Sequence, residues 1–130
     1  SRAVLMTLIN LGLDFEVRGN SIVNLMSLKL NQFQTKVINT SLGEHKSEEY
    51  LKINPQGTIP AVMDDDFLMT ESRAIMTYLV DAKSPNNSLY PSEDLKARFI
   101  IDHRLYYDAS TFSPTLLAAI VRLFFIYSYK

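Results

Sequence analysis

Residues 54–60 read Asn-Pro-Gln-Gly-Thr-Ile-Pro, and the chain soon continues with Glu71-Ser72-Arg73 at the head of a helical pattern. The first segment predicts a proline-fixed turn that leads into a short strand. At Ile59, a strand edge would offer free backbone N–H and C=O groups to an extended peptide. The second segment places a carboxylate and a hydroxyl at a helix start, where unpaired N–H groups favour an anion. Together the two segments predict a site for a small zwitterionic peptide.

Each of these residues also has an ordinary explanation when it is taken alone. A trans bond before Pro60 is favoured, since cis bonds are rare. Glu71 and Ser72 can simply cap a helix and leave a solvated charge pair. His45 reads as a surface histidine, and His103, on the inner stripe of a helix, reads as a satisfied core residue. Only the combination of motifs favours a binding site.

The composition describes a globular chain. It has 130 residues, 47% hydrophobic and 21% charged, with a net charge of −1. That balance gives no reason to expect a nucleic-acid partner. No cysteine is present, which excludes disulfides, thiolate metal sites and a Cys-x-x-Cys redox centre, and which is compatible with the cytosol. No apolar run approaches the roughly 20 residues that span a bilayer, because Arg122 interrupts the most apolar stretch. We therefore expect neither a metal ion nor a membrane partner.

The spacing of apolar residues predicts an α/β unit. Helices are expected over 2–11, over 48–53 behind the capping Ser47, and from Thr70 or Glu71 onward. Strands are expected over 37–40, 60–63 and 67–70. The last two strands form a hairpin whose turn is residues 64–66, three aspartates that repel one another and need water.

The rest of the chain reads as helical. Residues 84–91 hold two prolines and two asparagines and predict a linker. Ser92 is expected to cap the next helix, and Pro114 is expected to interrupt it before another helix begins at Thr115. Residues 17–34 show competing helical and strand periods, and neither is favoured.

Several motifs in order closely resemble cytosolic glutathione transferases, with the insect-type delta and epsilon classes nearest. The segments that carry the resemblance are Leu42-Gly43-Glu44-His45, residues 54–60, Glu71-Ser72-Arg73-Ala74-Ile75, Leu89-Tyr90-Pro91 and Arg104-Leu105-Tyr106-Tyr107-Asp108. The resemblance implies a thioredoxin-like N-terminal domain over 1–83 and the start of an all-α C-terminal domain over 84–130. It covers residues 1–16 and 36 to about 120.

The resemblance also implies roles at the site. Ile59 would pair its backbone with the cysteinyl unit of glutathione, and Pro60, after Thr58, would be the cis-proline. Glu71 and Ser72 would hold the γ-glutamyl end with support from Arg73, and His45 would help to bind the glycyl carboxylate. The thiolate of glutathione is the nucleophile, so the enzyme must lower the pKa of that thiol.

The chain departs from the family pattern in three ways. The catalytic serine of these classes aligns before Ser1, so none of the present residues is expected to be catalytic, and the first strand is missing with it. Gly57 stands where many members carry histidine, which we expect to weaken the contact with the glycyl carboxylate. Residues 17–34 have no counterpart in the family.

Three explanations of the insert remain open. The first is an in-frame retained intron. Val17-Arg18 can be encoded by GTAAGA, which fits a splice donor, and Phe33-Gln34 can be encoded by TTTCAG, which fits a splice acceptor. Val121-Arg122 suggests a second one over 121–130. A genuine surface insertion is the alternative. In the third, residues 22–30 substitute for the missing strand.

The resemblance thus implies a cytoplasmic, homodimeric enzyme that conjugates glutathione to electrophilic small molecules in detoxification. This chain by itself is expected to be impaired. The alternative is a non-catalytic binding or interaction module of the same family. A thiol-disulfide oxidoreductase is disfavoured, because the chain has no cysteine.

Overall fold

The computed structural model describes residues 2–13, 15–18, 24–29, 32–64 and 66–128. The chain divides into two compact units, Ser1–Pro85 and Asn86–Lys130. The first unit is a thioredoxin-like domain with a small sheet and three α-helices among its described residues, and the second is helical.

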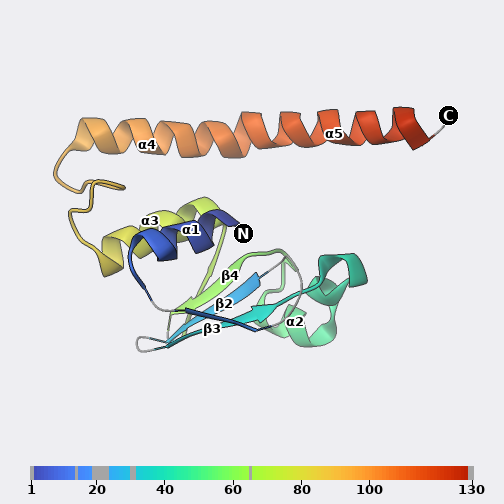
Figure 1. Cartoon of the computed structure of the whole chain (residues 1–130), viewed down its shortest axis with the longest axis horizontal. Helices are drawn as coiled ribbons and strands as arrows, with labels where there is room; N and C mark the ends of the chain where they lie inside the picture. The colour runs from blue at the N-terminus through green and yellow to red at the C-terminus, as the bar shows by residue number, and fades with distance from the viewer. Residues whose placement is uncertain (1, 14, 19–23, 30–31, 65, 129–130) are drawn as a thin grey trace. The chain divides into compact units, whose positions relative to one another are not determined.

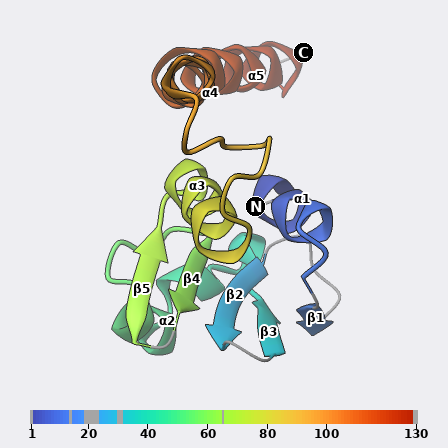
Figure 2. The same cartoon turned by 90° about the vertical axis from the view of Figure 1, so that its left-hand side faces the viewer.

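The sheet of the first unit has five strands in the order β1-β3-β2-β4-β5 (Figure 2). Their bounds are Phe15–Arg18 for β1, Asn24–Lys29 for β2, Gln32–Val37 for β3, Ala61–Asp64 for β4 and Phe67–Thr70 for β5. β1 runs parallel to β3, whereas β4 and β5 are an antiparallel pair. The expected hairpin is therefore confirmed, while the strand expected over 37–40 is wrong. β3 ends at Val37, and Thr40–Leu42 forms a 3-10 turn.

β2 occupies the centre of this sheet. It pairs antiparallel with β3 from Asn24 to Lys29 and parallel with β4 through Met26, Ser27 and Leu28. Of the three explanations of the insert, this agrees with the one in which residues 22–30 substitute for the missing strand. The backbone groups on the inner edges of β3 and β4 thus find partners that they would otherwise lack.

The helices of the first unit cover both faces of the sheet (Figure 1). α1 (Arg2–Asn10) and α3 (Ser72–Lys83) lie side by side over one face, and α2 (Glu48–Ile53) lies on the other. α2 begins where expected, because Ser47 Oγ accepts a hydrogen bond from Tyr50 N at 3.2 Å.

Two buried clusters form the core because successive residues of a strand point to opposite faces. Beneath α1 and α3, the cluster consists of Val4, Leu8, Val62, Met69, Ile75 and Leu79. On the side of α2, it consists of Ile38, Tyr50 and Ala61, with Ile53, Ile59 and Leu68 packed against them. Ala61 and Val62 therefore anchor β4 in both clusters, which fixes the strand that leads out of the 54–60 loop.

Asp64 departs from the expected solvated turn. It is the last residue of β4, and its side chain is only 10% exposed. Tyr78 donates a hydrogen bond to Asp64 Oδ2 at 2.7 Å, and Lys83 Nζ lies 3.6 Å from the same oxygen. The hairpin is thereby tied to the C-terminal half of α3.

The second unit contains one long helical stretch. α4 (Leu95–Tyr107) continues through a π-helical turn (Asp108–Phe112) into α5 (Ser113–Ser128). Pro114 does not interrupt it, because Ser113 N bonds to Asp108 O, five residues back, and this wider turn accommodates the proline. Ser92 does not cap α4 either. Asp94 does so, accepting from Lys96 N at 3.1 Å and Ala97 N at 3.0 Å.

Tyr90 is buried before this helix and holds the preceding loop to it. Its hydroxyl donates to Asp102 Oδ1 at 2.8 Å, and Arg98 Cζ lies 3.9 Å from the centre of its ring. Burial raises the pKa of Tyr90 above 10.0, and the bond to Asp102 raises it further, whereas Arg98 lowers it. The phenol therefore remains a donor at neutral pH.

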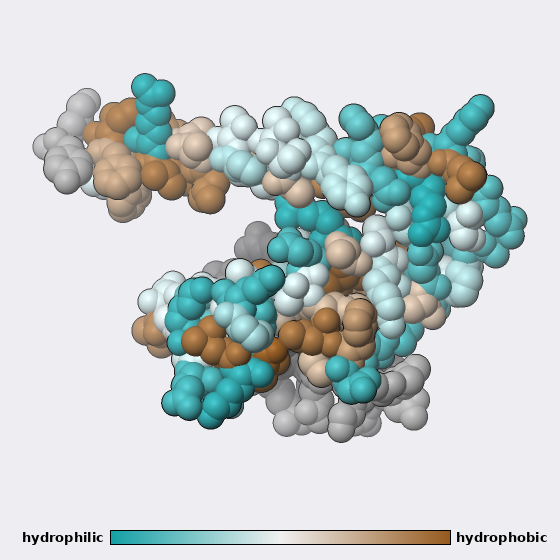
Figure 3. All heavy atoms as spheres, turned by 180° about the vertical axis from the view of Figure 1, so that it is seen from behind, coloured by the Kyte–Doolittle hydropathy of each residue, from teal (hydrophilic) through white to brown (hydrophobic). Residues whose placement is uncertain are grey.

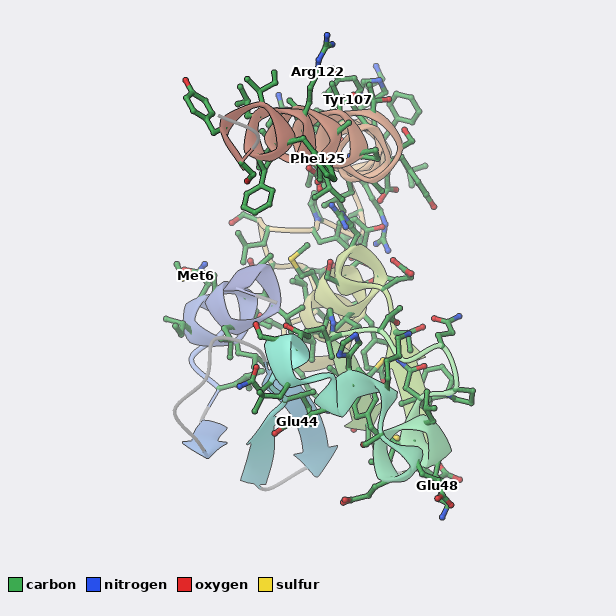
Figure 4. All side chains as sticks on the ribbon, turned by 90° about the vertical axis from the view of Figure 1, so that its right-hand side faces the viewer. Met6, Glu44, Glu48, Tyr107, Arg122 and Phe125 are labelled. Atoms are coloured by element: carbon green, nitrogen blue, oxygen red, sulfur yellow. The ribbon has the colours of Figure 1, made fainter. Side chains whose placement is uncertain are left out.

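Apolar side chains gather along the C-terminal part of the long helix (Figure 3), and side chains such as Tyr107, Arg122 and Phe125 project outward from it (Figure 4). Phe125 is 56% exposed. By length and composition alone, Leu95–Ser128 passes a test for a membrane-spanning helix, contrary to the expectation from the sequence. Length and composition alone do not assign a membrane role to this helix.

The position of β2 leads to a direct test. Met26→Pro removes a main-chain N–H and disrupts the register with both Thr35 and Val62. We expect the free energy of unfolding, measured by urea denaturation, to fall by about 1–3 kcal/mol for each ladder partner that is left unpaired. The control is Val17→Pro in β1, which pairs only with β3 among the described strands. Equal midpoints for Met26→Pro and the unaltered chain would contradict a central β2.

Candidate functional site

The register of the hairpin brings the two sequence motifs to one end of the sheet. Ala61 pairs with Thr70, and this is the pair nearest the open end of the hairpin. Ile59 and Pro60 enter β4 at that end, and Glu71 and Ser72 leave β5 there. Two segments that are separate in the sequence therefore become neighbours through main-chain pairing.

Polar contacts around the Thr58 carbonyl set the shape of the 54–60 loop. This oxygen accepts from Tyr50 Oη at 2.6 Å and from Asn54 Nδ2 at 2.8 Å. Asn54 is 1% exposed, and its Oδ1 accepts from Gln56 N at 3.1 Å. Burial raises the pKa of Tyr50 above 10.0, partly offset by its hydrogen bond with Asn54, so its hydroxyl stays protonated and able to donate.

The peptide bond between Ile59 and Pro60 is cis. The resemblance implied this isomer, whereas the residues alone favoured trans. Ile59 is half-buried, and neither its N–H nor its C=O is bonded to another described residue. These groups match the requirement for pairing with the backbone of an extended ligand.

Glu71 makes a sharp entry into α3. Its φ is 67° and its ψ is 105°, a conformation that side-chain-bearing residues rarely adopt and that costs on the order of 1–3 kcal/mol. It is the N-cap residue of α3, but its side chain makes no capping bond. The N–H of Ser72, the first residue of the helix, has no partner among the described residues, and N–H groups at a helix start attract anions. Ser72 is partly buried. Arg73 follows on the same turn and is also partly buried.

The segment that carries His45 packs against the 54–60 loop. His45 lies in the 3-10 turn Glu44–Lys46 and is partly buried rather than on the surface, as its residue type alone suggested. Its Nδ1 is enclosed and has no hydrogen-bond partner among the described residues. Nδ1 is therefore shielded from solvent. Figure 4 labels Glu44 and Glu48 on this side of the unit. Glu44 Oε2 accepts a hydrogen bond from Asn39 N at 2.6 Å.

The structure places two further residues, Lys46 and His103, differently from what the sequence suggested. Lys46 was not singled out from the sequence, yet its Nζ lies 3.2 Å from the carbonyl oxygen of Gln56 inside the loop. Only the glycine at position 57 hints in the sequence that a neighbouring side chain could approach there. His103 belongs to the second unit and is exposed, so its expected place in a core is wrong.

The described residues contain no group of three or more His, Cys, Asp or Glu side chains placed to hold a metal ion. The polar groups at the open end of the hairpin are instead main-chain amides, a hydroxyl and charged side chains. Such an arrangement can bind and orient a small peptide that carries both an ammonium and a carboxylate.

Comparison with known proteins identifies relatives with the same sequence pattern. The family described as "Glutathione S-transferase, N-terminal domain" matches residues 6–81. Glutathione S-transferase 1 of Manduca sexta is 40% identical over 99 residues, which are 76% of this chain and 45% of that protein.

Two solved structures show the same likeness in three dimensions. An epsilon-class glutathione S-transferase from the housefly, Musca domestica, has a TM-score of 0.71 and 40% identity, over 95% of this chain and 49% of that one. A glutathione transferase homologue from Drosophila mojavensis with bound glutathione has a TM-score of 0.65 and 36% identity, over 84% and 41%. The chain thus spans about half the length of these relatives.

Asn54 offers a test of the loop. Asn54→Ala leaves the N–H of Gln56 without its side-chain acceptor and removes one of the two donors to Thr58 O. We expect the free energy of unfolding to fall by about 1–3 kcal/mol in urea denaturation. Gln56→Ala, at an exposed neighbour, is the control and should change it by less than about 0.5 kcal/mol. Similar losses in both variants would show that Asn54 does not organise the loop.

Proposed function

Because this chain belongs to the glutathione S-transferase family, we propose that residues 1–83, with 17–34 as an insert, form a glutathione-binding domain. Residues 84–130 are then part of the helical domain. We further propose that the whole protein transfers glutathione to electrophilic small molecules in detoxification. Family resemblance alone supports the homodimer and the cytoplasmic location that we assign to it.

The pairing of Ala61 with Thr70 is the observation that carries this proposal. It brings the main chain of Ile59, which has no hydrogen-bond partner among the described residues, to the same end of the hairpin as the N-terminus of α3. Glutathione has an ammonium and a carboxylate at its γ-glutamyl end, a thiol in the middle and a second carboxylate at its glycyl end. The N-terminus of α3 matches the charged γ-glutamyl end, and the main chain of Ile59 matches the cysteinyl unit that carries the thiol.

We assign each residue a role on chemical grounds. Ile59 N–H and C=O pair with the cysteinyl backbone, with Thr58 and Pro60 fixing the direction of the chain. Ser72 and the first N–H groups of α3 receive the γ-glutamyl carboxylate. Glu71 receives the ammonium, Arg73 supports the charge balance at that end, and His45 lies toward the glycyl end.

Held in this way, glutathione presents its thiol in a fixed position. The reaction needs the thiolate, which attacks the electrophile. The described residues contribute binding and orientation, because fixing the nucleophile before attack lowers the entropic part of the barrier.

Ser72→Ala tests the site. Loss of a hydrogen bond from a hydroxyl to a carboxylate should raise the glutathione dissociation constant about tenfold, measured by isothermal titration calorimetry. Ser88→Ala, at an exposed serine of the second unit, is the matched control and should leave binding unchanged. Equal heats from Ser72→Ala and the unaltered chain would remove Ser72 from the site. Absence of glutathione binding by the unaltered chain would overturn the proposal.

A further inference from the structure

Gly57 and Lys46 form a close contact that the family roles do not explain. Gly57 has a φ of +58°, and a β-carbon at this position would lie 2.7 Å from Lys46 Nζ and 2.9 Å from Lys46 Cδ. It would also lie 2.9 Å from the carbonyl oxygen of His45. The absent side chain of Gly57 therefore leaves the space in which the lysine side chain lies.

The contact holds the ammonium group of Lys46 at the loop. Nζ donates to the carbonyl oxygen of Gln56 at 3.2 Å. An ammonium group has three donors, so two remain for another acceptor. Two acidic residues lie equally near along the chain, and both have other partners: Glu44 Oε2 accepts from Asn39 N at 2.6 Å, and Glu48 pairs with Lys52 at 3.0 Å. Lys46 itself is exposed, so a ligand can reach it.

We propose that Lys46 binds the glycyl carboxylate of glutathione from the space above Gly57, in the place of a side chain from residue 57. This inference rests on the proposed function. Gly57 comes two residues before Ile59 in the chain, whereas Ser72 is the first residue of α3, so the proposal assigns Lys46 to the end of the tripeptide beyond the cysteinyl unit. The tripeptide is then held at three points, its two carboxylates at the ends and its backbone in the middle.

The structure favours Lys46 over His45 for this role. Nδ1 of His45 is shielded from solvent, whereas the ammonium group of Lys46 belongs to an exposed residue. The ammonium group of Lys46 is a compact donor with three N–H groups, only one of which is used by Gln56 O. Gly57 was expected to weaken the contact with the glycyl carboxylate. In this proposal, the glycine instead makes room for the ammonium group of Lys46.

Lys46→Gln tests the inference with two ligands, glutathione and its glycine monoethyl ester, in which the glycyl carboxylate is uncharged. We expect Lys46→Gln to raise the dissociation constant of glutathione about tenfold and to leave that of the ester nearly unchanged. Lys46→Arg should retain most of the affinity for glutathione. Lys52→Gln is the matched control, because Lys52 is an exposed lysine on α2 that pairs with Glu48 at 3.0 Å. It should change neither affinity.

The outcomes separate this inference from the proposed function. Two results would show that Lys46 does not recognise the carboxylate. In the first, Lys46→Gln and the unaltered chain bind glutathione with the same dissociation constant. In the second, Lys46→Gln raises the dissociation constants of glutathione and of the ester by the same factor. If the unaltered chain binds neither ligand, the proposed function fails and the role of Lys46 fails with it. The inference is supported if only Lys46→Gln loses affinity and if it loses affinity for glutathione but not for the ester.

Discussion

The antiparallel pairing of β4 with β5 is the constraint on which the rest of the first unit depends. These strands are short, but each sends residues into both buried clusters, Ala61 and Leu68 on one face and Val62 and Met69 on the other. A shift of the register by one residue would exchange the two faces, so burial fixes the pairing. The same pairing determines which residues stand at the open end, and Ile59 and Ser72 are neighbours for that reason. At the opposite end, Asp64 ties the hairpin to α3.

The centre of the sheet is formed by residues 24–29, within the segment that we expected to be an insert. β2 runs antiparallel to β3 and parallel to β4, so the inner edges of both strands are paired. An unpaired interior strand edge would leave backbone groups without partners, each at a cost of about 1–3 kcal/mol. The origin of residues 17–34 in the gene is a separate matter, which the genomic sequence resolves. Codons without GT at Val17 or without AG at Gln34 would exclude a retained intron.

Local signals were sufficient to predict much of this fold. α2 begins after Ser47, whose side chain caps it, and α3 begins after Glu71, where the helical spacing of apolar residues starts. Both signals act within a few residues. Long-range effects caused the errors. The competing periods of residues 17–34 could not reveal a strand whose partners lie on either side of it in space. Pro114 read as an interruption because the π-helical turn before it leaves no signature in the sequence. At the site, the motifs indicated Ile59 and Ser72, whereas Lys46 became visible only through its contact above Gly57.

The central claim is that one end of the β4–β5 hairpin binds glutathione through main-chain groups. Amide hydrogen exchange, measured by nuclear magnetic resonance with and without saturating glutathione, tests it most directly. The account predicts slower exchange at the amides of Ile59 and Ser72 when glutathione is bound, because both N–H groups then donate to the ligand. Unchanged exchange at these two amides, with protection appearing elsewhere in the chain, would contradict it.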